Sequence, residues 1–172
     1  MEKIELMDLK EILENAIISE ELAANFYRDL SSQLDDGLLK DKLSFLSKQE
    51  EQHKKLLEEI FEDFYPNEKV EKPKKTIIFE CSSYTEKIDS LKTIIQAIEM
   101  AMNCEIRAES IYKMLVKKVS KRYAKNLFKY LADMEHSHYL SLKLEYKYME
   151  NIGEIKISKN TQYPYFLIFK NH

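Results

Sequence analysis

The chain has 172 residues, a formal net charge of −3, 44% hydrophobic residues and 33% charged residues. These proportions are typical of a globular protein that is large enough to bury a core, and the small negative charge gives no reason to expect nucleic-acid binding. No apolar run approaches the roughly 18–20 residues of a membrane span, and the charged N-terminus lacks the apolar core of a signal peptide, so we expect a cytoplasmic protein with no membrane partner.

The spacing of apolar residues predicts long helices, and only two glycines and three prolines are present to interrupt them. We expect four helices, at about residues 9–30, 38–64, 91–118 and 121–149. Asp8 and Glu11 form a capping-box pattern before the first helix, and Pro66 should end the second. Asp89–Ser90 and Ser120 are cap candidates for the last two helices, and the residues around Gly153 should end the fourth.

The connections between these helices differ in length. Asp35–Gly37 is short enough to make the first two helices antiparallel neighbours. Residues 65–89 contain Pro66, Pro73 and a lysine cluster and can span the length of a helix, so the second connection should be a crossover. The expected fold is therefore an all-α four-helix bundle with one long crossover between helices 2 and 3, formed by residues 1–153.

The remaining residues, 154–172, form an apolar C-terminal tail. Tyr163–Phe169 is dense in aromatic residues and too apolar to be left in water. We expect the tail to pack on the bundle or on a neighbouring subunit, and the protein to form a homodimer or a higher oligomer.

One pattern of potential metal ligands occurs twice. Glu-x-x-His appears late in the second helix and again late in the fourth, and such a pair lies one turn apart on one helix face. Thirty residues before each pair stands a glutamate followed by alanine and tyrosine at the same intervals. The first set is Glu20, Ala23, Tyr27, Glu50 and His53, and the second, 85 positions later, is Glu105, Ala108, Tyr112, Glu135 and His138.

Four carboxylates on the inner faces of four helices need positive charge, because bare carboxylates in an apolar core are costly. Two divalent cations would balance them, and the two histidines would add neutral nitrogen ligands. By symmetry, Glu50 and Glu135 should bridge the metals. Glu20 with His53 and Glu105 with His138, or the crossed pairing, would complete the two ends. Mixed oxygen and nitrogen ligands suit iron or manganese, and zinc would also bind.

Plainer interpretations exist for several of these residues. Tyr27 and Tyr112 are either ordinary core aromatics or catalytic groups that donate hydrogen bonds or electrons near the metals. His136 lies off the inner helix face and should be a surface histidine. A bundle whose carboxylates and histidines are purely structural would bind no metal.

The doubled pattern resembles the ferritin-like di-iron superfamily and, within it, the ferritin-like domain of rubrerythrins. The residues that carry the resemblance lie in Glu20–Tyr27, Glu50–His53, Glu105–Tyr112 and Glu135–His138, and the likeness extends over about residues 8–150. It implies two iron ions and an oxidoreductase of the peroxidase or ferroxidase type, which reduces peroxide or dioxygen with electrons from an external donor such as a rubredoxin.

The sequence departs from rubrerythrins in two ways. It has no paired CxxC motifs, so it carries no rubredoxin site. Where rubrerythrins place an extra ligand glutamate on the third helix it has Ala108, and Glu109 is the nearest substitute. The six-residue set is closer to the sites of bacterioferritin and of di-iron hydroxylases. An iron-binding or storage protein and a di-iron hydroxylase of an organic substrate are therefore the alternative functions.

Overall fold

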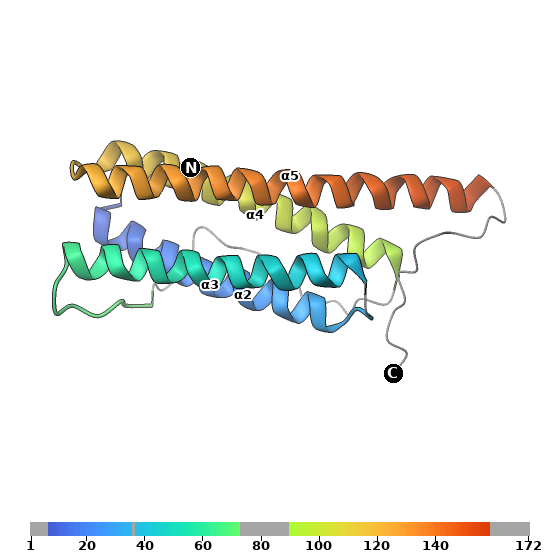
Figure 1. Ribbon diagram of the computed structural model, residues 1–172, viewed down its shortest axis with the longest axis horizontal. Coiled ribbons are helices and arrows are strands. Elements are labelled where there is room, and N and C mark those ends of the chain that lie inside the picture. Colours follow the sequence, from blue (N-terminus) through green and yellow to red (C-terminus); the bar gives the residue numbers. More distant parts are fainter. Residues whose placement is uncertain (1–6, 36, 73–89, 159–172) are drawn as a thin grey trace.

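The computed structural model describes residues 7–35, 37–72 and 90–158, with side chains described as far as residue 151. These residues form four long helices (Figure 1). The helices are α2 (Leu9–Ser32), α3 (Leu38–Phe64), α4 (Leu91–Lys118) and α5 (Arg122–Ser158). None of the described helices is long and apolar enough to cross a membrane.

The helices are arranged as two antiparallel pairs. The main packing partners are α2 with α3 and α4 with α5, and Figure 1 shows that α3 and α4 run in the same direction. The end of α3 and the start of α4 therefore lie at opposite ends of the bundle, and the connection between them must run its whole length. This confirms the predicted all-α, ferritin-like four-helix bundle with one crossover. The central part of that connection, residues 73–89, lies outside the described residues.

Local sequence explains most helix ends. The Asp8 carboxylate accepts a hydrogen bond from the Glu11 backbone N–H at 2.9 Å, and the Glu11 carboxylate accepts one from the Asp8 N–H at 3.2 Å, which confirms the predicted capping box. Ser90 caps α4 in the same way, with Thr93 as its reciprocal partner. Such a cap stabilises a helix by about 1 kcal/mol. At the end of α3 the residue before Pro66 has left the helical region, with φ −133° and ψ 62°.

The fourth predicted helix is wrong at both ends. Its first residue is Arg122, and the Lys121 carbonyl, in the cap position expected for Ser120, accepts a hydrogen bond from the Lys125 N–H at 3.1 Å. The helix also continues past Gly153 to Ser158. A glycine ends a helix when it turns into the left-handed region, and no described glycine lies in that region. Inside a helix it costs only about 1 kcal/mol relative to alanine.

The core consists of two apolar clusters, and each draws residues from all four helices. One cluster lies near the start of α3 and α4 and includes Leu30, Leu43, Ile98 and Leu142. The other lies toward the opposite end and includes Ile17, Leu57, Leu115 and Phe128. In every helix the Glu and His residues of the doubled pattern fall between the residues that enter the two clusters. A layer of ionisable side chains therefore divides the apolar core in two.

Candidate metal centre

The polar layer contains all six of the predicted ligands. Helix periodicity places them on the inner faces, because Glu-x-x-His brings two side chains to the same side within one turn. Each residue is at most 4% exposed. The six residues are Glu20 from α2, Glu50 and His53 from α3, Glu105 from α4, and Glu135 and His138 from α5. Ionisable groups buried this deeply require either partner charges or a bound cation.

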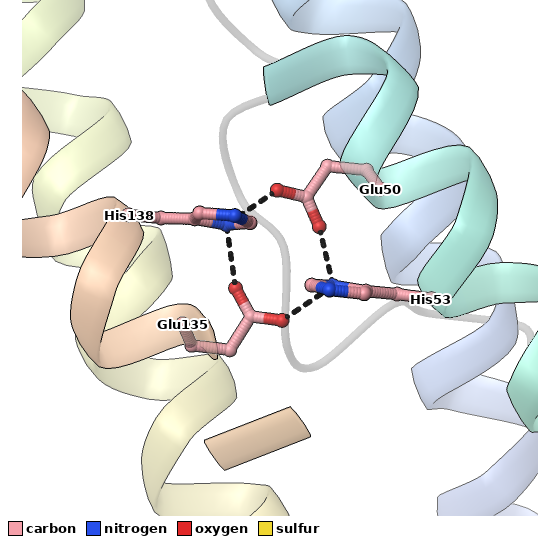
Figure 2. Close-up of side chains that lie close together, drawn as sticks. All are labelled: Glu50, His53, Glu135 and His138. Carbon is pink, nitrogen blue, oxygen red and sulfur yellow. Dashed lines mark hydrogen bonds and ion pairs between the residues drawn. The ribbon is translucent and has the colours of Figure 1, made fainter. Parts of the chain in front are cut away.

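Four of the six form a compact central group. Figure 2 shows Glu50 and His53 from α3 facing Glu135 and His138 from α5, with carboxylates and imidazoles alternating around a ring. Each carboxylate contacts both imidazoles. His53 Nδ1 lies 3.1 Å from Glu50 and 2.9 Å from Glu135. His138 Nδ1 lies 2.9 Å from Glu50 and 3.4 Å from Glu135. One ligand atom from each residue can be chosen so that all four lie within 4.8 Å of one another.

The other two carboxylates lie at the outer sides of this group. Glu20 Oε2 is 3.7 Å from His53 Nδ1, and Glu105 Oε2 is 3.7 Å from His138 Nδ1. The structure thus places each outer glutamate beside the histidine of its own half of the chain, which is the uncrossed one of the two predicted arrangements. The two halves of the centre repeat each other residue for residue.

The two tyrosines of the doubled pattern contact the outer carboxylates of the opposite half. The Tyr27 hydroxyl donates a hydrogen bond to Glu105, and the Tyr112 hydroxyl donates one to Glu20. Both rings are completely buried, at 0% and 1% exposure. Burial, reinforced by the neighbouring carboxylates, raises the pKa of both hydroxyls well above 10. The tyrosines therefore stay protonated and act as hydrogen-bond donors.

The carboxylates of the protein without metal differ in charge state. Burial and the charge of Glu50 raise the pKa of Glu20 to about 8, and burial and the charges of Glu50 and Glu20 raise the pKa of Glu135 well above 4.5. Burial also acts to raise the pKa of Glu50, but contacts with His138 and His53 outweigh it and lower that pKa below its ordinary value. The centre therefore takes up protons when nothing else supplies positive charge.

The histidines carry part of that positive charge. Burial acts to lower their pKa, but the surrounding carboxylates outweigh it. They raise the pKa of His138 to about 12 and raise that of His53 as well. In the protein without metal, two imidazolium groups face a cluster of partly protonated carboxylates.

Several buried atoms at the centre lack a hydrogen bond of acceptable geometry. Within the described part of the chain these are Glu50 Oε1, Glu135 Oε1, His53 Nε2 and both ring nitrogens of His138. Some approach an opposite charge at 2.9 Å but are poorly aligned for a hydrogen bond. Buried polar atoms nearly always have partners. These converging oxygen and nitrogen atoms are buried and lack well-aligned hydrogen bonds, and they fit the donor set of iron, manganese or zinc.

Glu109 and His136 lie away from the centre. The Glu109 carboxylate accepts a hydrogen bond from Lys113 and lies 3.2 Å from His136 Nδ1, and the His136 side chain is 52% exposed. In the first half of the chain, Arg28 and Glu51 occupy the positions of Lys113 and His136 and form an ion pair. The first half thus has a carboxylate, Glu51, where the second half has His136. Glu109 supplies a carboxylate to the second half instead, which gives Glu109 a structural role.

Sequence reasoning found the six residues but not every contact among them. The cross-half hydrogen bonds of Tyr27 and Tyr112 were missed. Their signal in the sequence was the matched placement of each tyrosine seven residues after a glutamate. That spacing shows that the tyrosine shares the inner face of its helix, but it does not identify the helix on which its partner lies.

Comparison with known proteins adds two findings. A family model described as rubrerythrin matches residues 11–146. A solved structure described as a hypothetical protein from Pyrococcus furiosus is similar to this chain, with 33% sequence identity and a TM-score of 0.83, covering 87% of this chain and 95% of the other. Among curated proteins, none matches this sequence.

Proposed function

This chain belongs to the rubrerythrin family, and on that premise we propose that it binds two iron ions and reduces peroxide or dioxygen with electrons from a separate donor protein. The buried cluster of Glu and His residues fits a dinuclear metal site. Iron as the metal, peroxide or dioxygen as the oxidant and a rubredoxin-like protein as the donor are the proposed parts of this function.

The observation that carries the proposal is the symmetric sharing of the central carboxylates. Glu50 and Glu135 each contact both imidazoles, whereas Glu20 and Glu105 each lie beside one. Two carboxylates in shared positions and two in outer positions would suit a pair of metals, which Glu50 and Glu135 would hold between them together with Glu20 and Glu105. A single metal would leave one half of this arrangement without a function.

The charges of the residues also favour two divalent cations. Four carboxylates would balance four positive charges, and the two histidines would then bind as neutral ligands. Metal binding would release the protons that the centre holds without metal, because those protons and the metal ions occupy the same region.

The surrounding residues would hold the ligands in place. Hydrogen bonds from Tyr27 and Tyr112 fix the free carboxylate oxygens of Glu105 and Glu20, and groups in such positions commonly orient metal ligands. The two apolar clusters on either side of the polar layer keep bulk water away from it. Iron held there would supply electron transfer to peroxide or dioxygen, and the chain would supply the ligands, the hydrogen bonds that orient them and the exclusion of water.

The electrons are proposed to come from another protein. A rubredoxin site uses four cysteine ligands, and these 172 residues contain two cysteines. An external donor such as a rubredoxin would therefore deliver electrons to the surface of the bundle near the centre.

The test combines metal analysis with rapid kinetics. Protein produced in iron-replete medium should contain about two iron ions per chain, and its reduced form should be oxidised by peroxide or dioxygen in a stopped-flow experiment. Repeated turnover should require added reduced rubredoxin. Glu135→Ala should abolish the reaction, and Glu109→Ala, which removes a carboxylate outside the centre, serves as the matched control.

Three outcomes would contradict the proposal. Failure of both oxidants together with rapid turnover of an organic substrate would indicate a hydroxylase. Uptake of iron far beyond two ions per chain, followed by growth of a ferric mineral, would indicate a storage protein. Absence of any bound metal would indicate a structural bundle.

A further inference from the structure

The outer side of α5 carries large apolar side chains that are exposed. Leu140, Leu144 and Tyr148 are 46%, 68% and 41% exposed. They follow one another at intervals of four residues, so they form a stripe along one face of the helix. Leu142 and Met149, on the opposite face, are almost completely buried in the core. The stripe is therefore an apolar surface separate from the core of the bundle.

Helix α3 extends this surface. Lys42 of α3 forms a half-buried ion pair with Glu145 of α5, which brings the two helices side by side at this level. Leu38 and Phe45 lie one turn before and one turn after Lys42 on the same face of α3, and they are 75% and 57% exposed.

We call these five residues the α3–α5 patch: Leu38, Phe45, Leu140, Leu144 and Tyr148. Large apolar side chains exposed on neighbouring helices favour a surface that another chain segment or molecule covers. The patch residues come from the first third of α3 and the second half of α5, and α5 extends beyond its neighbours at its C-terminal end (Figure 1).

The chain supplies a segment suited to covering this patch. Residues 159–172 follow directly after α5 and lie outside the described residues. Tyr163–Phe169 has the sequence Tyr-Pro-Tyr-Phe-Leu-Ile-Phe, with no charged side chain. Four polar residues, Lys159–Gln162, separate it from the helix. We propose that Tyr163–Phe169 folds back in an extended conformation and docks on the α3–α5 patch of the same chain, antiparallel to α5.

The length of the segment allows this return. From Ser158 back to Tyr148 the helix measures about 15 Å, and back to Leu140 about 27 Å, at about 1.5 Å per residue. An extended chain advances about 3.3 Å per residue, so Tyr165 reaches up to about 23 Å from Ser158 and Phe169 up to about 36 Å. The reach of Tyr165 exceeds the distance back to Tyr148, and the reach of Phe169 exceeds the distance back to Leu140. The difference leaves length for the chain to reverse direction at Lys159–Gln162.

The spacing of the side chains also matches. Residues four apart on a helix are separated by about 6 Å along its axis, and residues two apart on an extended chain by about 6.6 Å. Tyr165, Leu167 and Phe169 can therefore lie over Tyr148, Leu144 and Leu140 in that order. Pro164 disfavours continuation of the helix and favours the extended conformation.

Photo-cross-linking of the full-length chain tests the proposal. A benzoyl-phenylalanine introduced in place of Leu144 should form cross-links to residues 163–169 after irradiation, identified by mass spectrometry of the digested protein. The same group in place of Tyr130 is the matched control. Tyr130 is also 49% exposed on α5, but it lies about 42 Å from Ser158, too far for the apolar segment to cover after a reversal.

Mixing isotope-labelled and unlabelled protein before irradiation distinguishes contacts within one chain from contacts between chains. Cross-links from position 144 to residues 163–169 with a single isotope composition are the expected result. Cross-links of mixed composition would show that a second copy covers the patch, either with its tail or with its own α5, and would overturn the proposal. The proposal would also be overturned if position 144 formed no cross-link to residues 163–169 or to a second copy, or if positions 144 and 130 gave equal yields.

A thermodynamic cycle gives an independent measurement. Leu144→Ser and Leu167→Ser should each lower Tm, because each removes an apolar contact, and the double variant should lower Tm by clearly less than the sum of the two shifts. The pair Tyr130→Ser and Leu167→Ser should give additive shifts. Additive shifts for Leu144 and Leu167 as well would contradict docking of the tail on this patch.

Discussion

The hydroxyl of Tyr27 donates a hydrogen bond to Glu105, a residue 78 positions later in the chain. The equivalent contact runs from Tyr112 back to Glu20. Each tyrosine follows a glutamate on its own helix but binds the glutamate of the other half. The two halves of the chain are therefore joined in the polar layer by reciprocal contacts between α2 and α4, two helices that otherwise pack only weakly against each other.

Replacing Tyr27 by phenylalanine should weaken metal binding. The variant keeps the ring in the core and removes only the hydrogen bond that orients Glu105. Loss of such supporting contacts typically lowers metal affinity by about 10–100-fold, and we expect a fall of this size by competition with a chelator. Tyr112→Phe should behave alike. Tyr130→Phe, on the exposed face of α5, is the control, and an effect of Tyr27→Phe no larger than the control's would contradict the assignment.

The two central and the two outer glutamates should differ in their effects on metal stoichiometry. Glu50→Ala or Glu135→Ala should reduce the metal content from about two ions per chain to less than one, because each residue is expected to bind both metals. Glu20→Ala or Glu105→Ala should leave one metal bound more tightly than the other. Elemental analysis of purified variants measures both outcomes. At most one metal in the unaltered protein, with Glu135→Ala harmless to its binding, would exclude a dinuclear centre.

Removal of the metals should make stability depend on pH. A carboxyl group whose pKa is raised in the folded state contributes stability that is complete below its ordinary pKa and is lost as pH rises through the folded-state pKa. For Glu20 this window extends from 4.5 to about 8, and Glu135 acts in the same direction. His138, raised from 6.5 to about 12, continues the loss at higher pH. The lowered pKa of Glu50 affects stability only below pH 4.5.

The free energy of unfolding of the metal-free protein should therefore fall steadily between pH 5 and 9, as measured by urea denaturation. The metal-loaded protein should show a much weaker dependence, because bound cations replace the protons. A melting temperature of the metal-free protein that stays constant from pH 5 to 8 would contradict the charge states described for the centre.

Metal binding should also raise overall stability. A ligand that binds only the folded state stabilises it by about 4 kcal/mol at a free concentration 1,000 times its Kd. Thermal unfolding with and without a chelator should show a higher Tm for the loaded form. In Glu50→Ala this difference should largely disappear, whereas in Glu109→Ala it should persist. Equal Tm values with and without metal in the unaltered protein would contradict metal binding at this centre.

Glu109→Gln should leave the centre intact. Its carboxylate, half-buried itself, interacts with the largely exposed side chains of Lys113 and His136, and an ion pair with such partners contributes about 1 kcal/mol. We expect unchanged metal stoichiometry and a small change in Tm. A loss of one metal ion in this variant would show that Glu109 moves inward to serve as a ligand.

The sequence was sufficient to predict most of the fold because its signals are local. The helix bounds at Leu9, Phe64 and Leu91 follow from a capping box, a proline and a serine cap, which act within a few residues. The six residues of the centre were predictable because each interrupts an apolar stripe on its own helix. The prediction that the fourth helix ends near Gly153 was wrong, because a glycine ends a helix only when its backbone leaves the helical conformation. The presence of a glycine does not determine whether the backbone does so.

The contacts between helices could not be predicted in the same way. The choice of Glu105 as the partner of Tyr27 depends on how far α2 and α4 are rotated about their axes and on their relative height. Both quantities are set by packing of side chains from all four helices. Symmetry predicted that Glu50 bridges the two metals, and this stays a prediction. The contacts of Glu50 with both His53 and His138 come from that packing.

The polar layer between the two apolar clusters also constrains how the helices align along the bundle. Sliding one helix by a single turn moves it about 5.4 Å and would carry a glutamate such as Glu50 out of the layer and into contact with leucine and isoleucine side chains. Burying a carboxylate there, without a partner, costs several kcal/mol. A continuous apolar core of leucine and isoleucine, without a polar layer, would tolerate such a shift far better. The residues assigned to metal binding thus also select one alignment of the four helices over its neighbours during folding.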